Sequence, residues 1–289
     1  MHNLFRKSLK KLVVGLFVLL LFNCKTSSVS FTTPPGRVGL EEVFSDSSDY
    51  LIYVDLDDNR ELISEQIEDM TLSKNVKNFI NNSYELYIGV GSSSEIILVG
   101  DFSKGLLDIG LFFSLDWKRE SNNGVKYWHS RDGLNLYIRD SRTIVLSNNH
   151  ITSTILKLGE KNLTPSSGSA HIIVPVVTEE LLKSLTKGFM KSGIDSMEFI
   201  TNRNDSIYTS TCIISLPTSG KAKTFSRVIE LVLKLLVSGS TDYWIKDISD
   251  NIRIKVVEKD VLVENILIKD KNIVEMAKKL IIMNREADK

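Results

Sequence analysis

The body of the chain, from residue 50 onward, alternates apolar runs with polar turns and with apolar positions at helical spacing. Tyr50–Leu56 is almost continuously apolar and predicts a buried strand, followed by a helix to about Met70 with Asp57 or Asp58 as its N-cap. Residues 71–82 are polar and rich in asparagine. The pattern then predicts a hairpin at 84–99, a helix at 102–117, a break at 118–124, a hairpin at 134–146 and a helix at 151–158.

The same order of elements begins again after residues 162–169, whose Pro, Ser and Gly content is typical of a linker. The second half predicts a strand at 171–177, a helix at 178–190, a hairpin at 197–216, a helix at 221–237, a hairpin at 252–268 and a closing helix at 273–283. Corresponding elements are offset by roughly 112 to 120 residues, which favours an internal duplication. Chance agreement between two coarse assignments is the alternative.

Each half has about five strands, mostly in hairpins, and two or three helices. This content predicts an α+β fold of two tandem pseudo-symmetric βαββαββα units. In each unit, an antiparallel or mixed sheet would be covered by amphipathic helices.

A different pattern occupies the N-terminus. Its basic head consists of Arg6, Lys7, Lys10 and Lys11. The following run, Leu12–Phe22, is apolar apart from Gly15, and this arrangement is typical of a signal peptide. A helix of that length rises only about 16 Å, against roughly 30 Å of hydrocarbon, so the run does not span a membrane by itself.

The run ends in Leu21-Phe22-Asn23-Cys24, which resembles the lipobox of bacterial lipoprotein precursors. The resemblance implies cleavage before Cys24, a diacylglycerol on its sulfur and a fatty acid such as palmitate on its amine. Phe22 and Asn23 replace the usual small residues, a looseness similar to that of spirochaete lipoboxes. The polar stretch 25–36 is typical of a flexible tether, and three acyl chains would hold the chain on its membrane. A plain signal peptide with an incidental cysteine is the alternative.

These patterns together predict the domain organisation of the whole chain. Its parts are a signal peptide at 1–23, a lipidated cysteine with tether and lead-in at 24–49, a first α+β unit at 50–161, a linker at 162–169 and a second unit at 170–289.

Charge and cysteine content narrow the function further. The leader holds four basic and no acidic residues, so the remaining chain has 32 basic against 36 acidic residues. This weak acidity argues against nucleic acid as a partner, and no block of Lys or Arg follows the leader to attract anionic headgroups. Cys212 is the only cysteine after Cys24, so we expect no disulfide within the chain and a buried thiol.

Asp55 and Asp57 are the sharpest catalytic candidates. Their segment, Ile52–Asn59, resembles the first motif of haloacid-dehalogenase-type phosphatases, which implies Asp55 as nucleophile and Asp57 as acid and base beside magnesium. Asn59 departs from the family's Thr or Val, and we favour aspartates that cap a helix. The four histidines lie at no metal-ligand spacing, and we expect neither a metal nor a cofactor.

Two predicted helices, 102–117 and 221–237, carry apolar residues around more of their circumference than a single stripe. The excess requires burial in a middle position of the fold, in an apolar ligand cavity or at the membrane to which Cys24 ties the chain. The candidate membrane- or ligand-contact residues are Leu106, Leu107, Phe112, Phe113, Phe225, Val232, Leu235 and Leu236.

We therefore predict a non-enzymatic lipoprotein, anchored by Cys24 in the cell envelope, at the outer rather than the inner membrane. Its broad apolar helices would bind lipid, membrane or an envelope protein. The body also resembles treponemal outer-membrane-associated lipoproteins, in which amphipathic helices accompany an α/β body. The alternative is a tethered, magnesium-dependent, phosphatase-like hydrolase that uses Asp55 and Asp57.

Overall fold

The structure is a computed structural model that describes most of the chain between residues 37 and 269. The described ranges are 37–44, 48–61, 63–64, 74–91, 94–148, 152–163, 168–177, 193–205, 207–239 and 250–269. Within them, the chain forms two compact units, residues 37–163 and residues 168–269. The predicted signal peptide, Cys24, the polar stretch 25–36 and the helices expected at 178–190 and 273–283 lie outside the described residues.

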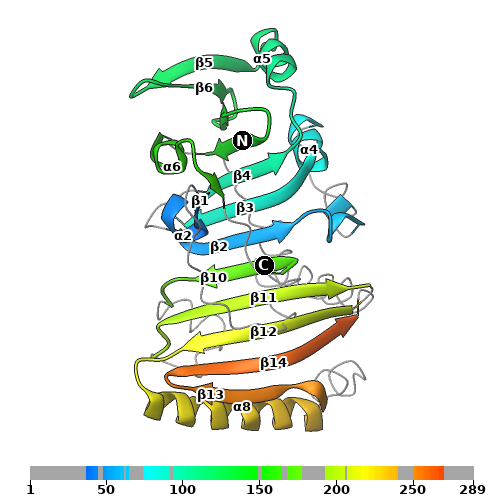
Figure 1. Cartoon of the computed structure of the whole chain (residues 1–289), viewed down its shortest axis with the longest axis vertical. Helices are drawn as coiled ribbons and strands as arrows, with labels where there is room; N and C mark the ends of the chain where they lie inside the picture. Colours follow the sequence, from blue (N-terminus) through cyan, green and yellow to red (C-terminus); the bar gives the residue numbers. More distant parts are fainter. Residues whose placement is uncertain are drawn as a thin grey trace, which may run out of the picture. The chain divides into compact units, whose positions relative to one another are not determined.

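The first unit is built on seven antiparallel strands (Figure 1). The strands are β2 (Ser48–Asp55), β3 (Ser83–Gly91), β4 (Ser94–Gly100), β5 (Trp117–Asn122), β6 (Val125–Ser130), β7 (Asn135–Ile138) and β8 (Thr143–Ser147). Their spatial order is β2-β3-β4-β8-β7-β6-β5. The predicted hairpins at 84–99 and 134–146 are confirmed as β3–β4 and β7–β8.

The helices whose bounds lie within the described residues of the first unit are short. They are α2 (Leu40–Val43), α4 (Lys74–Asn81), α5 (Lys104–Phe112) and α6 (Thr152–Leu158). Two further short strands, β1 (Arg37–Val38) and β9 (Asn162–Leu163), pair in parallel.

The core of the first unit lies in its central strands. Ile52, Tyr87, Ile97 and Ile144 come from β2, β3, β4 and β8, and all four are fully buried. These strands carry runs of consecutive buried residues, such as Leu51–Val54, which is why their sequences read as nearly continuous apolar segments.

The second unit has five described antiparallel strands and one described helix. They are β10 (Ala170–Val174), β11 (Ser196–Asn204), β12 (Ile207–Ser215), α8 (Ser219–Gly239), β13 (Arg253–Val257) and β14 (Asp260–Lys269). The strand order is β10-β11-β12-β14-β13, and α8 packs against β13 and β14 (Figure 1). The predicted hairpins at 197–216 and 252–268 are confirmed.

The predicted α+β fold with helices covering a sheet is wrong. The described chain is mostly antiparallel sheet, with twelve strands besides β1 and β9, and the helices of its first unit have nine residues or fewer. The βαββαββα order fails in the first unit because residues 118–124, expected to be a break, form a hairpin between β5 and β6. Both units nevertheless share one strand order over five strands, β2-β3-β4-β8-β7 and β10-β11-β12-β14-β13.

The β5–β6 hairpin turns at Asn123–Gly124. Both residues have positive φ, 50° and 79°, as a two-residue hairpin loop of the mirror-image type requires. Asn-Gly between strands is the strongest local signal for such a loop. The strand before it was not predicted because β5 is exposed along most of its length and therefore has polar residues in place of an apolar pattern.

Two local assignments also change. Residues 71–82 include α4, whose Phe79 and Ile80 are buried, and the Ser83 hydroxyl donates to the Phe79 carbonyl at 2.6 Å. Asp55, rather than Asp57 or Asp58, accepts the backbone N–H groups of residues 57 and 58, each at 3.0 Å.

None of the helices among the described residues is both long enough and apolar enough to cross a membrane.

Candidate functional site

The most unusual surface of the first unit is the outer side of α5 and the turn that follows it. Five apolar side chains there are largely exposed, and we call them the α5 cluster. They are Leu106 (70% exposed), Ile109 (56%), Phe112 (69%), Phe113 (77%) and Leu115 (84%). Positions 106, 109 and 113 follow helical spacing, so they form one stripe, and the Phe112 and Phe113 rings contact edge to face at 5.4 Å.

The opposite side of α5 fixes the helix to the sheet. Leu111 is buried, and the indole Nε1–H of Trp128, itself buried on β6, donates to Asp108 Oδ1 at 3.0 Å. The Lys104 ammonium donates to the Arg139 carbonyl at 2.9 Å. These contacts hold α5 with its apolar stripe outward, so a middle position in the fold does not account for its apolar excess.

A cleft of about 470 Å³ lies between α4 and α5. The buried rings of Phe79 and Phe102 meet edge to face there, with centroids 6.5 Å apart, and Leu106 and Leu107 line it from α5. Its remaining lining residues are Asn78, Asn82, Asp101, Ser103, Gly110, Leu111 and Ser114. The cleft is therefore continuous with the α5 cluster through Leu106, and its lining is half polar.

The helix α8 occupies the corresponding place in the second unit, after the third strand of the shared order. Its inner face buries Ala222, Phe225 and Ser226. Leu231 (58% exposed) lies on its outer side, and Val232 (39%) lies two helical turns beyond Phe225. Its other described apolar residues, Val228, Ile229 and Leu233, are partly buried, so α8 leaves fewer apolar side chains exposed than α5.

The eight predicted contact residues lie in different environments. Leu106, Phe112 and Phe113 belong to the α5 cluster, Val232 is exposed, and Leu107 is partly buried in the cleft. Phe225 is buried in the interior of the second unit. Leu235 and Leu236 lie on α8, but their side chains are outside the described part.

Ile109, Leu115 and Leu231 were missed as candidate contact residues. All three lie in the apolar helical runs, so the signal was available, but which side of each helix faces the sheet follows from tertiary packing.

Asp55 and Asp57 are engaged in local structure. The Asp55 carboxylate accepts its two backbone N–H groups, and Asp57 pairs with Arg60 at 2.6 Å. Burial raises the pKa of the Asp55 carboxyl, against the hydrogen bonds that lower it. The strand that ends at Asp55, β2, pairs antiparallel with β3. No group of acidic, His or Cys side chains within the described ranges is arranged to hold a metal ion.

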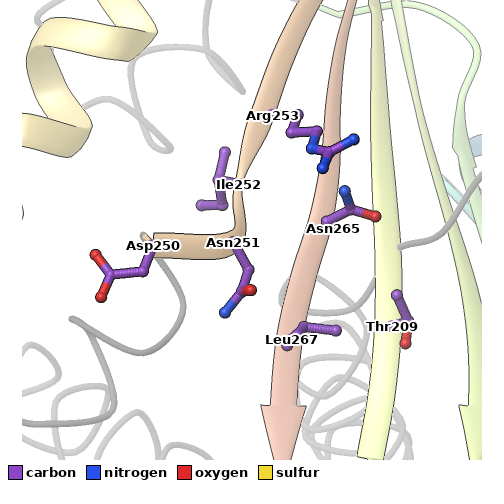
Figure 2. Close-up of a pocket in the computed structure, with 7 residues that line it drawn as sticks. All are labelled: Thr209, Asp250, Asn251, Ile252, Arg253, Asn265 and Leu267. Carbon is purple, nitrogen blue, oxygen red and sulfur yellow. The ribbon is translucent and has the colours of Figure 1, made fainter.

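A polar hollow of about 260 Å³ lies on the second unit (Figure 2). Its residues are Thr209, Asp250, Asn251, Ile252, Arg253, Asn265 and Leu267. Asn265 has φ +60° where the β12–β14 register shifts, a bulge next to Glu264, which pairs with Arg253 across the β13–β14 ladder. Asp250 points away from Arg253 and Asn265, so the charged groups do not converge on one point (Figure 2). The α5 cluster is therefore the stronger candidate site.

Comparison with known proteins gives a likeness of fold. No protein-family model matches the chain, and no curated protein matches it in sequence. Among solved structures, crystal form III of TP0453, a treponemal lipoprotein, is similar with a TM-score of 0.56 and 13% identity, over 83% of this chain and 97% of that one. Crystal form I gives a TM-score of 0.55 and 13% identity, over 84% and 98%.

At this identity the likeness extends to the fold alone. It agrees, in outline, with the resemblance to treponemal lipoproteins expected from the sequence. The lipobox on which the other part of that expectation rests is outside the described residues.

Proposed function

We propose that this protein is a lipid-anchored lipoprotein of the cell envelope, at the outer membrane, whose body contacts membrane lipid through the α5 cluster. The observation that carries the proposal is the exposure of five large apolar side chains on one short helix and its following turn. Contiguous apolar surface of this kind on a folded unit marks a contact site for a membrane, a partner or a ligand.

The energy available to such a contact is substantial. Fully burying one Leu, Ile or Phe side chain contributes roughly 1.5–3 kcal/mol, so inserting the α5 cluster partway into the headgroup region contributes on the order of 5 kcal/mol. A lipid on Cys24 would hold the body at high local concentration beside the bilayer, where even a weak contact is occupied.

Two further observations support an envelope lipoprotein that is not an enzyme. The structural neighbour TP0453 is itself a treponemal lipoprotein. The best catalytic candidates, Asp55 and Asp57, are bound to backbone N–H groups and to Arg60. An apolar ligand in the α4–α5 cleft is a second arrangement, favoured by the buried rings of Phe79 and Phe102 in its lining.

The test is flotation of residues 25–289, which contain every described helix and strand, with vesicles of neutral phosphatidylcholine. We expect the wild-type body to float, and Phe112→Glu with Phe113→Glu to weaken binding by at least about tenfold, because two charged side chains cannot enter the apolar layer. The matched control is Leu156→Glu with Val176→Glu, two equally exposed apolar residues elsewhere.

Circular dichroism verifies that both double variants fold. A folded wild-type body that stays in solution, or an equal loss in both variants, would contradict the proposal. Binding of a dispersed fatty acid without flotation would favour the cleft instead.

A further inference from the structure

The outer face of α8 carries a stripe of basic side chains. Lys223, Arg227 and Lys234 are spaced by four and seven residues, which places them on one side of a helix. All three are exposed, whereas Ala222, Phe225 and Ser226 point into the sheet. We call these three residues the α8 stripe.

Little negative charge opposes the α8 stripe. Glu230 is the sole acidic residue of α8, against four basic ones. Among the described residues, no ion pair involves Lys223, Arg227 or Lys234. The α5 helix, by contrast, has one basic residue, Lys104, and one acidic residue, Asp108.

An exposed apolar side chain borders the stripe. Leu231 is 58% exposed and follows Arg227 by one helical turn. A helix that combines a buried face, a basic outer stripe and a bordering apolar side chain matches the chemistry of an anionic membrane surface, where phosphates meet the acyl boundary. Lys and Arg reach such phosphates on long stems, and Arg binds them with two parallel hydrogen bonds.

We infer that the α8 stripe binds the phosphates of anionic lipid headgroups, so that the body selects anionic over neutral membrane. The inference rests on the proposed membrane contact but concerns a different surface, in the second unit. It revises the sequence-based expectation that no basic block remains for anionic headgroups. That expectation considered neighbours along the chain, whereas the helix brings together residues that are four and seven positions apart.

The experiment compares binding of residues 25–289 to phosphatidylcholine vesicles with and without a minor fraction of phosphatidylglycerol. Each basic side chain near an anionic surface strengthens binding by about fivefold. The triple variant Lys223→Gln, Arg227→Gln and Lys234→Gln is therefore expected to lose about 100-fold in affinity for anionic vesicles and to keep its affinity for neutral ones. Raising the salt concentration should remove the same surplus from the wild type.

The matched control is Lys118→Gln, Lys126→Gln and Lys259→Gln, which changes the net charge equally at exposed sites on β5, β6 and the β13–β14 turn. Glu230→Gln provides a variant in the other direction and should strengthen anionic binding by a few fold, since it removes the acidic group beside the stripe.

The outcomes separate the two proposals. Loss in the stripe variant alone supports the inference. Equal wild-type affinity for neutral and anionic vesicles overturns the inference and would leave an acidic protein as the partner that fits the stripe. Equal loss of affinity in the control triple variant also overturns it. Failure to bind neutral vesicles while anionic binding depends on the stripe would instead overturn only the α5 proposal.

Discussion

The helices α5 and α8 both follow the third strand of a unit with the same five-strand order, yet α5 exposes most of its apolar side chains and α8 buries part of its own. The α5 helix buries Leu111 and presents the five apolar side chains of its cluster outward. The α8 helix buries Phe225 and Ala222 against its sheet and presents a basic stripe. Both sequences read as over-apolar helices, so apolar content alone does not distinguish a structural helix from an exposed one.

The difference lies in what each helix leaves uncovered. A short helix held at one side by Leu111 and the Asp108–Trp128 hydrogen bond leaves most of its surface free. A long helix packed along β13 and β14 has enough sheet beneath it to cover its apolar face. The first therefore offers apolar surface for a partner, and the second offers charge.

The largest expected effect is on stability and separates buried from exposed phenylalanine. Phe225→Ala should lower the free energy of unfolding by about 3 kcal/mol, because it removes a buried ring and leaves a cavity. Phe112→Ala should change it by less than about 0.5 kcal/mol, since that ring is already in solvent. Urea unfolding followed by circular dichroism measures both. Equal costs would mean that α5 is packed as α8 is.

A smaller effect tests the β5–β6 hairpin of the first unit, which has no counterpart among the described residues of the second. Gly124→Ala should lower the free energy of unfolding by about 1 kcal/mol, because the backbone at φ +79° disfavours a Cβ atom although the space around it is open. The control is Gly110→Ala on α5, where a Cβ also meets nothing and φ is helical, so the substitution should be neutral or slightly stabilising. Urea midpoints of the two variants give the comparison, and a stabilised Gly124→Ala protein would argue against the turn.

The smallest effect concerns Glu95, a buried carboxyl on β4, the third strand of the first unit; the third strand of the second unit, β12, buries Cys212. Burial raises the pKa of Glu95, although the Thr154 hydroxyl donates to it at 2.7 Å and Lys157 is near. Between the ordinary pKa of a glutamate and the raised pKa of Glu95, the native state binds more protons than the unfolded state. The free energy of unfolding therefore falls as the pH rises through this range.

Glu95→Gln should remove this fall, so the variant gains stability relative to the wild type between mildly acidic and neutral pH. The measurement is urea unfolding at both pH values, with the exposed Glu160→Gln as the control. A parallel pH dependence of the wild type and the Glu95→Gln protein would refute the expectation.

Local sequence patterns sufficed for the hairpins. The pairs β3–β4, β7–β8, β11–β12 and β13–β14 alternate or run apolar on both sides of a polar turn, and turn chemistry acts over a few residues. The β5–β6 hairpin was missed although its Asn123-Gly124 turn is a strong signal, because an exposed strand has no apolar pattern. The predicted fold class was wrong because this hairpin was missed and because more of the described residues lie in strands than in helices.

The sequence by itself determined where the hairpins turn, which helices are rich in apolar residues and that Cys212 lies in an apolar environment, because all three depend on neighbours along the chain. Tertiary structure alone decided that Phe225 is interior while Phe112 is exposed, and that Lys223, Arg227 and Lys234 share an outer face. The physical reason is that exposure depends on which side of a helix meets a sheet, and that is set by strands far away in the sequence.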